Sequence, residues 1–174
     1  MSQPFQQGRL DGLCGVYALI NAVDVLCGPL SKRHAQTLFR DILSFLESRG
    51  PLAERCVEGI VIHDVAAILK HVICERYPIV RSKPFHRRPN VDKAIYLQTL
   101  AEFLTAERTI VFSGLDGQYS HWTLIHKITE QTLQLYDSDG MRFLLKSRCS
   151  MIRDVDNLRH RLLPTHTYLL QHKT

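Results

Sequence analysis

The first residue that could do chemistry is Cys14, which lies between Gly12 and Gly15, directly before an apolar run with helical spacing that extends to Leu26. At a helix N-terminus, backbone N–H groups and the positive end of the helix dipole stabilise a thiolate. The glycine after the cysteine lets a substrate carbonyl approach the backbone. Cys14 is therefore a candidate nucleophile. The alternative is a buried cysteine that packs as a small hydrophobic residue, and only a base elsewhere in the chain favours the catalytic interpretation.

Among the nine histidines, His121 has the setting of a general base, whereas most of the others fit solvent-facing or packed positions. It begins a β-rich segment, 121–125, and the next β-rich segment, 132–136, ends at Asp137. If the two segments pair as a hairpin, the end of the second lies beside the start of the first. Asp137 can then orient the imidazole of His121. Asp139 is the weaker candidate, because an aspartate in a turn commonly caps the backbone.

The elements that must position these residues change in character along the chain. Apolar spacing and capping signals predict helices at 13–26, 31–50, 64–75 and 92–106, and β-rich runs predict strands within 77–85 and at 109–112, 120–125, 132–136, 141–145 and 165–170. The segment through Glu54 and Glu58 is predicted as a polar connection, and 84–90 as an exposed loop. Helices followed by strands, with no internal repeat or linker, predict one α+β domain over residues 1–174.

The charge of the chain is mildly basic, with a net charge of +5 and a pI near 9.1. Its densest basic cluster, Lys83 to Arg88, is short and has no aromatic residues interleaved in a recognisable binding motif. Nucleic acid is therefore not an expected partner, and a solvated basic face is the preferred interpretation.

The N-terminus and the cysteines indicate the compartment. Residues 1–7 lack the charged and then apolar layout of a signal peptide, and no apolar run approaches membrane-spanning length. We therefore expect a cytoplasmic protein with no membrane partner, while signal-independent export into a target cell remains an alternative. The five cysteines show no CxxC spacing, so we expect reduced thiols rather than disulfides or a zinc site.

Taken together, these residues resemble the papain-like cysteine peptidases. More closely, they are similar to the double-glycine leader peptidase domains of bacteriocin exporters and their stand-alone relatives. The resemblance rests on the order of Cys14-Gly15, 28–31, 59–64, 121–125 and Asp137. It implies a papain-like fold, with N-terminal helices packed on a C-terminal antiparallel sheet. It also implies a catalytic triad of Cys14, His121 and Asp137.

The same resemblance implies an oxyanion-binding glutamine a few residues before the cysteine. Gln7 is the preferred residue, although it lies one position further from Cys14 than is usual in the family, and Gln6 is the alternative. The chain has Asp137-Ser138 where the family often has Asp-Pro. The transporter to which the leader peptidases are fused is absent, so a double-glycine leader substrate is not implied.

The function expected from these features is hydrolysis of an amide bond in a protein or peptide substrate through a thioester intermediate, without a metal or cofactor. A peptidase is the preferred reaction. Two alternatives use the same residues, namely a protein glutamine deamidase and an acyltransferase effector. A third alternative, from a different class, is a non-catalytic protein-binding module on the same scaffold.

Overall fold

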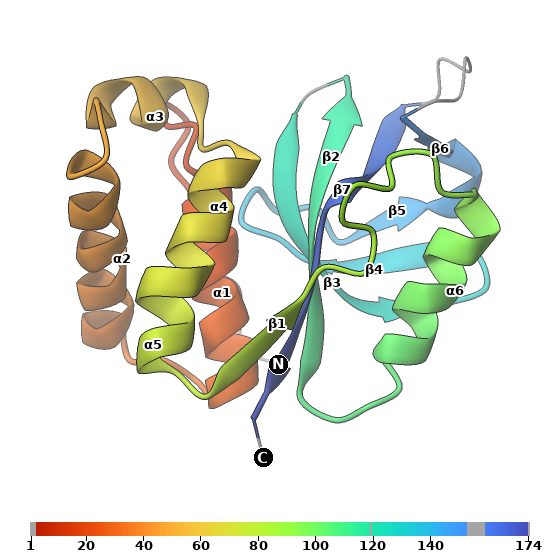
Figure 1. Ribbon diagram of the computed structural model, residues 1–174, viewed down its shortest axis with the longest axis horizontal. Coiled ribbons are helices and arrows are strands. Elements are labelled where there is room, and N and C mark those ends of the chain that lie inside the picture. The colour runs from red at the N-terminus through yellow and green to blue at the C-terminus, as the bar shows by residue number, and fades with distance from the viewer. Residues whose placement is uncertain (1–2, 119, 153–158, 174) are drawn as a thin grey trace.

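The computed structural model describes residues 3–118, 120–152 and 159–173. Within these ranges, a layer of helices packs on one face of a seven-stranded sheet, and a further helix covers the opposite face (Figure 1). The α+β class predicted from the order of the elements is confirmed. Residue 119 lies outside the described residues.

Two of the helices begin where the sequence combines an apolar stripe with a capping residue. The predicted caps Ser31 and Asp92 accept hydrogen bonds from first-turn N–H groups, at 3.2 Å from His34 and 2.7 Å from Ala94. The helices are α1 (Cys14–Cys27), α2 (Lys32–Glu47), α3 (Leu52–Glu58), α4 (Ile62–Ile68), α5 (Cys74–Arg76) and α6 (Lys93–Phe103), with a π-helical turn (Leu69–Ile73) between α4 and α5. No helix in the part of the chain that the structure describes is long and apolar enough to cross a membrane.

Helix α3 corrects one prediction, because the segment through Glu54 and Glu58 is helical rather than a connection. Pro51 at its N-cap and Gly59 at its C-cap, with a φ of 88°, delimit it. None of its residues is buried, so it carries no apolar stripe that periodicity could reveal.

The sheet has the strand order β1-β7-β2-β3-β4-β5, with antiparallel neighbours. The strands are β1 (Ile79–Ser82), β2 (Thr109–Gly117), β3 (His121–Ile128), β4 (Thr132–Tyr136), β5 (Phe143–Leu145), β6 (Cys149–Met151) and β7 (His160–His172). The short strand β6, which the sequence did not indicate, pairs in parallel with the start of β7. The predicted hairpin of β3 and β4 is present, with Leu124 opposite Tyr136. This register places Asp137 opposite Thr123, diagonally across from His121 and on the same face.

Two apolar cores hold the three layers together. The first lies between the helical layer and one face of the sheet, where Val16 and Leu19 join Phe112. The second lies between the opposite face and α6, where Leu100 joins Val111. Successive side chains of a strand point to opposite faces, so adjacent β2 residues belong to different cores. The burial of both faces fixes the register of β2 and of its neighbour β3, which begins with His121.

Candidate active site

Cys14 is the first residue of α1, and its side chain is largely buried. Its thiol lies 3.9 Å from the carbonyl oxygen of Gly12. Leu13 occupies the N-cap and has no side-chain oxygen that could accept from the first-turn N–H groups. The Asp11 carboxylate organises the preceding turn, because it accepts hydrogen bonds from the backbone of Gly8 at 2.8 Å and of Leu13 at 3.1 Å. The thiol is thus held beside an uncapped helix N-terminus, which favours an anion.

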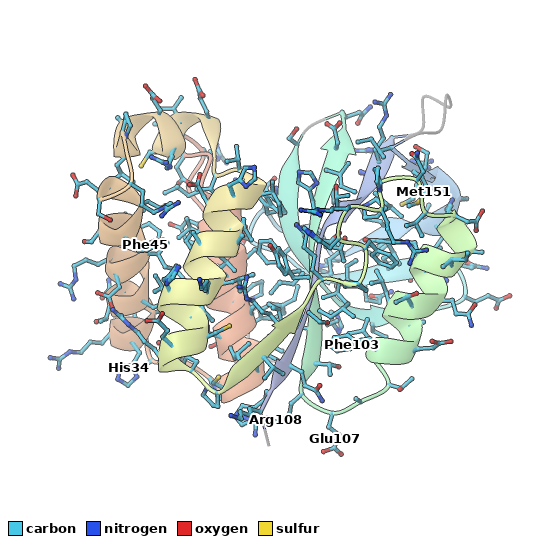
Figure 2. All side chains as sticks on the ribbon, in the orientation of Figure 1. His34, Phe45, Phe103, Glu107, Arg108 and Met151 are labelled. Atoms are coloured by element: carbon cyan, nitrogen blue, oxygen red, sulfur yellow. The ribbon has the colours of Figure 1, made fainter. Side chains whose placement is uncertain are left out.

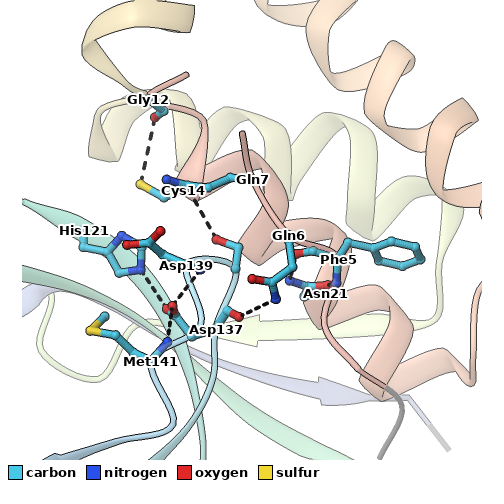
Figure 3. Close-up of polar contacts among 11 residues, drawn as sticks. Phe5, Gln6, Gln7, Gly12, Cys14, Asn21, His121, Asp137, Asp139 and Met141 are labelled. Carbon is cyan, nitrogen blue, oxygen red and sulfur yellow. Dashed lines mark hydrogen bonds and ion pairs between the residues drawn. The ribbon is translucent and has the colours of Figure 1, made fainter. Parts of the chain in front are cut away.

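His121 lies between the thiol and Asp137 (Figure 3). Its Nε2 atom is 2.7 Å from Oδ2 of Asp137, and the two side chains are 4% and 0% exposed. Nε2 is therefore engaged by the carboxylate, and the imidazole also has a side-chain hydrogen bond with Cys14. A thiol, an imidazole and a carboxylate thus form one line of hydrogen bonds across the boundary between α1 and the sheet.

The electrostatics of this line favour a protonated imidazole. Burial opposes the charge of His121, but the hydrogen bonds and charge interactions with Asp137 and Cys14 outweigh burial and raise its pKa to about 10. Burial likewise disfavours the charged form of Asp137, but the bond to His121 outweighs it and holds the pKa of the carboxyl below its usual range. The imidazolium is therefore the form that the site holds at neutral pH.

The second oxygen of Asp137 fixes the carboxylate in place. Its Oδ1 atom accepts hydrogen bonds from the backbone N–H groups of Asp139 at 2.8 Å and Met141 at 3.2 Å. Asp139, the weaker candidate from the sequence, has an exposed side chain and contributes its backbone to this turn. The hairpin therefore brings Asp137 against the imidazole, as its register requires.

The two candidate glutamines lie on a segment that runs beside the turn after β4. Gln6 donates its amide nitrogen to the carbonyl oxygens of Pro4 and Asp137, each at 3.2 Å. Gln7 is bound through its backbone N–H to the carbonyl of Ser138 at 3.0 Å, and its side-chain oxygen accepts from the Ser138 hydroxyl at 3.5 Å. In Figure 3 the Gln7 side chain extends toward Cys14. The Gln6 amide is thus bonded to backbone carbonyls, whereas the Gln7 side chain is bonded to the Ser138 hydroxyl.

Trp122 is a residue of the site that the sequence reasoning did not single out. Its indole N–H donates to the carbonyl of Ile60 at 2.8 Å, which ties the start of β3 to the segment before α4. A Cβ atom added at Gly15 would lie 2.7 Å from Ile60 and 2.9 Å from Trp122. The available signal was the glycine beside Cys14, because a residue without a side chain marks a close approach of two segments.

The cysteines and their neighbours form neither disulfides nor a metal-ligand group in the described part of the chain. All five cysteines are free thiols. Within the described ranges, no three or more Cys, His, Asp or Glu side chains are grouped as metal ligands would be.

We expect Gly15→Ala to lower the free energy of unfolding by about 1–3 kcal/mol, because the added methyl group overlaps Ile60 and Trp122. Urea denaturation of the variant and the wild type measures this change. In the Ile60→Ala background, Gly15→Ala should lower the free energy of unfolding by less, because the Ile60 side-chain atoms nearest to the added methyl group have been removed. Equal costs in the two backgrounds would contradict the packing argument.

The raised pKa of His121 predicts a pH dependence of stability. The folded state binds the His121 proton up to about pH 10, whereas the ordinary pKa is 6.5, so this stabilisation is complete below 6.5 and lost as the pH rises through 10. The free energy of unfolding of the wild type relative to His121→Gln should therefore decrease between pH 7 and pH 10. Asp137→Asn, which removes the charge that faces the imidazole, should flatten this profile. An unchanged profile in Asp137→Asn would assign the pH dependence to other groups.

Known proteins give no independent identification of this site. No model of a protein family matches the chain, and no curated protein is significantly similar to it in sequence.

Proposed function

We propose that the chain is a papain-like cysteine hydrolase that cleaves an amide bond of a protein or peptide substrate with Cys14 as nucleophile. The observation that carries the proposal is the buried line of hydrogen bonds from Cys14 through His121 to Asp137 at the N-terminus of α1. A thiol activated by an oriented imidazole is the requirement for nucleophilic attack on a carbonyl carbon. A core cysteine that served packing alone would need neither partner.

In the resting site the thiol proton already resides on His121, so Cys14 is a thiolate beside an imidazolium that Asp137 stabilises. The thiolate attacks the carbonyl carbon, and the carbonyl oxygen becomes an oxyanion held by the Cys14 backbone N–H and the Gln7 amide. The C–N bond then breaks, and the imidazolium gives its proton to the departing amine. Water, deprotonated by His121, attacks the resulting thioester, and the carboxylic acid leaves as the thiol is restored.

The surroundings of Cys14 support a polypeptide substrate. Leu10, Val57 and Val61 are 97%, 75% and 59% exposed. They flank segments that pack beside the nucleophile, because Gly12 donates to the Cys56 carbonyl at 2.7 Å and Ile60 packs on Gly15. Exposed apolar side chains beside a site are typical of surfaces that bind other proteins. Together with the resemblance to peptidases, this favours cleavage of a peptide bond.

Selective alkylation tests the activated thiol. We expect iodoacetamide to modify Cys14 faster than the other cysteines at pH 7, because a thiolate is the reactive form. The internal controls are well matched, since burial raises the pKa of Cys27 and Cys74 and raises that of Cys149 to about 11. Replacing His121 by Ala should slow Cys14 alkylation by about 10-fold or more. Peptide mass spectrometry gives the rate at each position, and a Cys14 rate no higher than the rest would contradict the proposal.

Turnover of an unfolded protein substrate, such as casein, tests the reaction itself. Cys14→Ala and His121→Ala should abolish product formation, and Asp137→Ala should reduce it by about 100-fold through loss of the orienting carboxylate. Mass spectrometry separates the outcomes, because new chain termini indicate a peptidase and a gain of about one mass unit without cleavage indicates deamidation. Full activity in Cys14→Ala would refute the mechanism. Stable casein binding without any product would favour the binding module.

A further inference from the structure

We propose that Asn21 is a positioning residue that holds Gln7 over the thiol, an inference that rests on the function proposed above. Asn21 lies on α1, seven positions beyond Cys14, and is fully buried. Seven residues are close to two helical turns, so the two side chains leave the same side of the helix. The helix that carries the nucleophile therefore also presents a buried amide along the same face.

The amide of Asn21 is fully engaged by the backbone of one residue. Its oxygen accepts from the Phe5 N–H at 2.8 Å, and its nitrogen donates to the Phe5 carbonyl at 3.1 Å (Figure 3). A buried amide is unfavourable unless both its donor and its acceptor are satisfied. An aspartate could only accept and a leucine could do neither. The paired bonds thus fix both the place and the orientation of Phe5 relative to α1.

The two residues after Phe5 are attached to the other half of the site. Gln6 donates to the carbonyl of Asp137 at 3.2 Å, and Gln7 donates its backbone N–H to the carbonyl of Ser138 at 3.0 Å. The segment 5–7 is therefore clamped between α1, which carries Cys14, and the turn that carries Asp137. Asn21 is the anchor on the α1 side, so it sets the distance between Gln7 and the thiol.

Two reactions of the thiol separate this role from a general structural one. Acylation by p-nitrophenyl acetate passes through a tetrahedral oxyanion before the C–O bond breaks, p-nitrophenolate leaves and a thioester forms. Alkylation by iodoacetamide displaces iodide at a saturated carbon and forms no oxyanion. A misplaced Gln7 should therefore slow the first reaction and leave the second unchanged, whereas damage to the pair of Cys14 and His121 slows both.

The experiment measures the first-turnover release of p-nitrophenolate and the alkylation rate of Cys14 in Asn21→Ala, Gln7→Ala and the double variant. We expect each single variant to lose about 10-fold or more in acylation at an unchanged alkylation rate. The double variant should match Gln7→Ala, because Asn21 acts through Gln7. Leu46→Ala, a core truncation in α2, is the control for lost stability and should leave the ratio of the two rates unchanged.

If Asn21→Ala does not fold, a second pair of variants at Phe5 tests the same inference without changing a residue of α1. Phe5→Pro and Phe5→Ala both lose the ring, but only the proline removes the N–H that Asn21 binds. Phe5→Pro should therefore lose more acylation than Phe5→Ala at equal alkylation rates. Equal acylation in this pair would overturn the inference.

The remaining outcomes separate the inference from the proposed function. The positioning role alone would be overturned if Asn21→Ala lost acylation and alkylation to the same extent. It would also be overturned if the loss of acylation in the double variant were the product of the losses in the two single variants. Unchanged acylation in Gln7→Ala would remove Gln7 from the mechanism and this inference with it. Acylation that persists in Cys14→Ala would refute the proposed function itself.

Discussion

The ion pair of His121 and Asp137 joins the first residue of β3 to the residue after β4, and both side chains are removed from water. Charges buried in this way are stable only when each has a partner and its remaining hydrogen-bonding atoms are satisfied. Backbone N–H groups of the following turn meet this demand for Asp137. The pair therefore requires the hairpin register, and the hairpin register requires the two apolar cores that cover β3 and its neighbours.

The contact between Cys14 and His121 joins two layers that the chain forms far apart in sequence. Hydrophobic packing brings α1 onto the sheet, but packing alone does not fix how far one layer slides along the other. Directional bonds do so at two places. Trp122 donates to Ile60 at 2.8 Å, and the Tyr136 hydroxyl donates to the Asp24 carboxylate on α1 at 3.2 Å. Trp122 follows His121 and Tyr136 precedes Asp137 in sequence. The strands that position the proposed catalytic residues therefore also align the sheet with the helical layer. Figure 2 shows the side chains packed between these layers.

Much of this arrangement follows from local patterns in the sequence. The apolar stripes predicted α1, α2, α6 and the helical segment that runs from α4 to α5. The α+β class is confirmed. Helix α3 was not predicted because none of its residues is buried, so it has no apolar stripe. Strand β6 was not predicted because its three residues are too few to show an alternating pattern. The bonds that Gln6 and Gln7 make to the turn after β4 were equally inaccessible from the sequence, because bonds between distant segments leave no periodic signal.

Polar residues within an otherwise apolar helix carried information that spacing alone did not. Asn21 and Asp24 interrupt the buried face of α1, and each is buried with its side chain bonded outside the helix. Most buried polar groups in proteins are hydrogen-bonded, and here each of the two interruptions marks a place where another segment is tied to the helix. Asn21 ties the segment of Gln7, and Asp24 ties β4 through Tyr136. The helix that presents the thiol thus also anchors the segment of Gln7, the proposed oxyanion donor, and the strand that leads to Asp137.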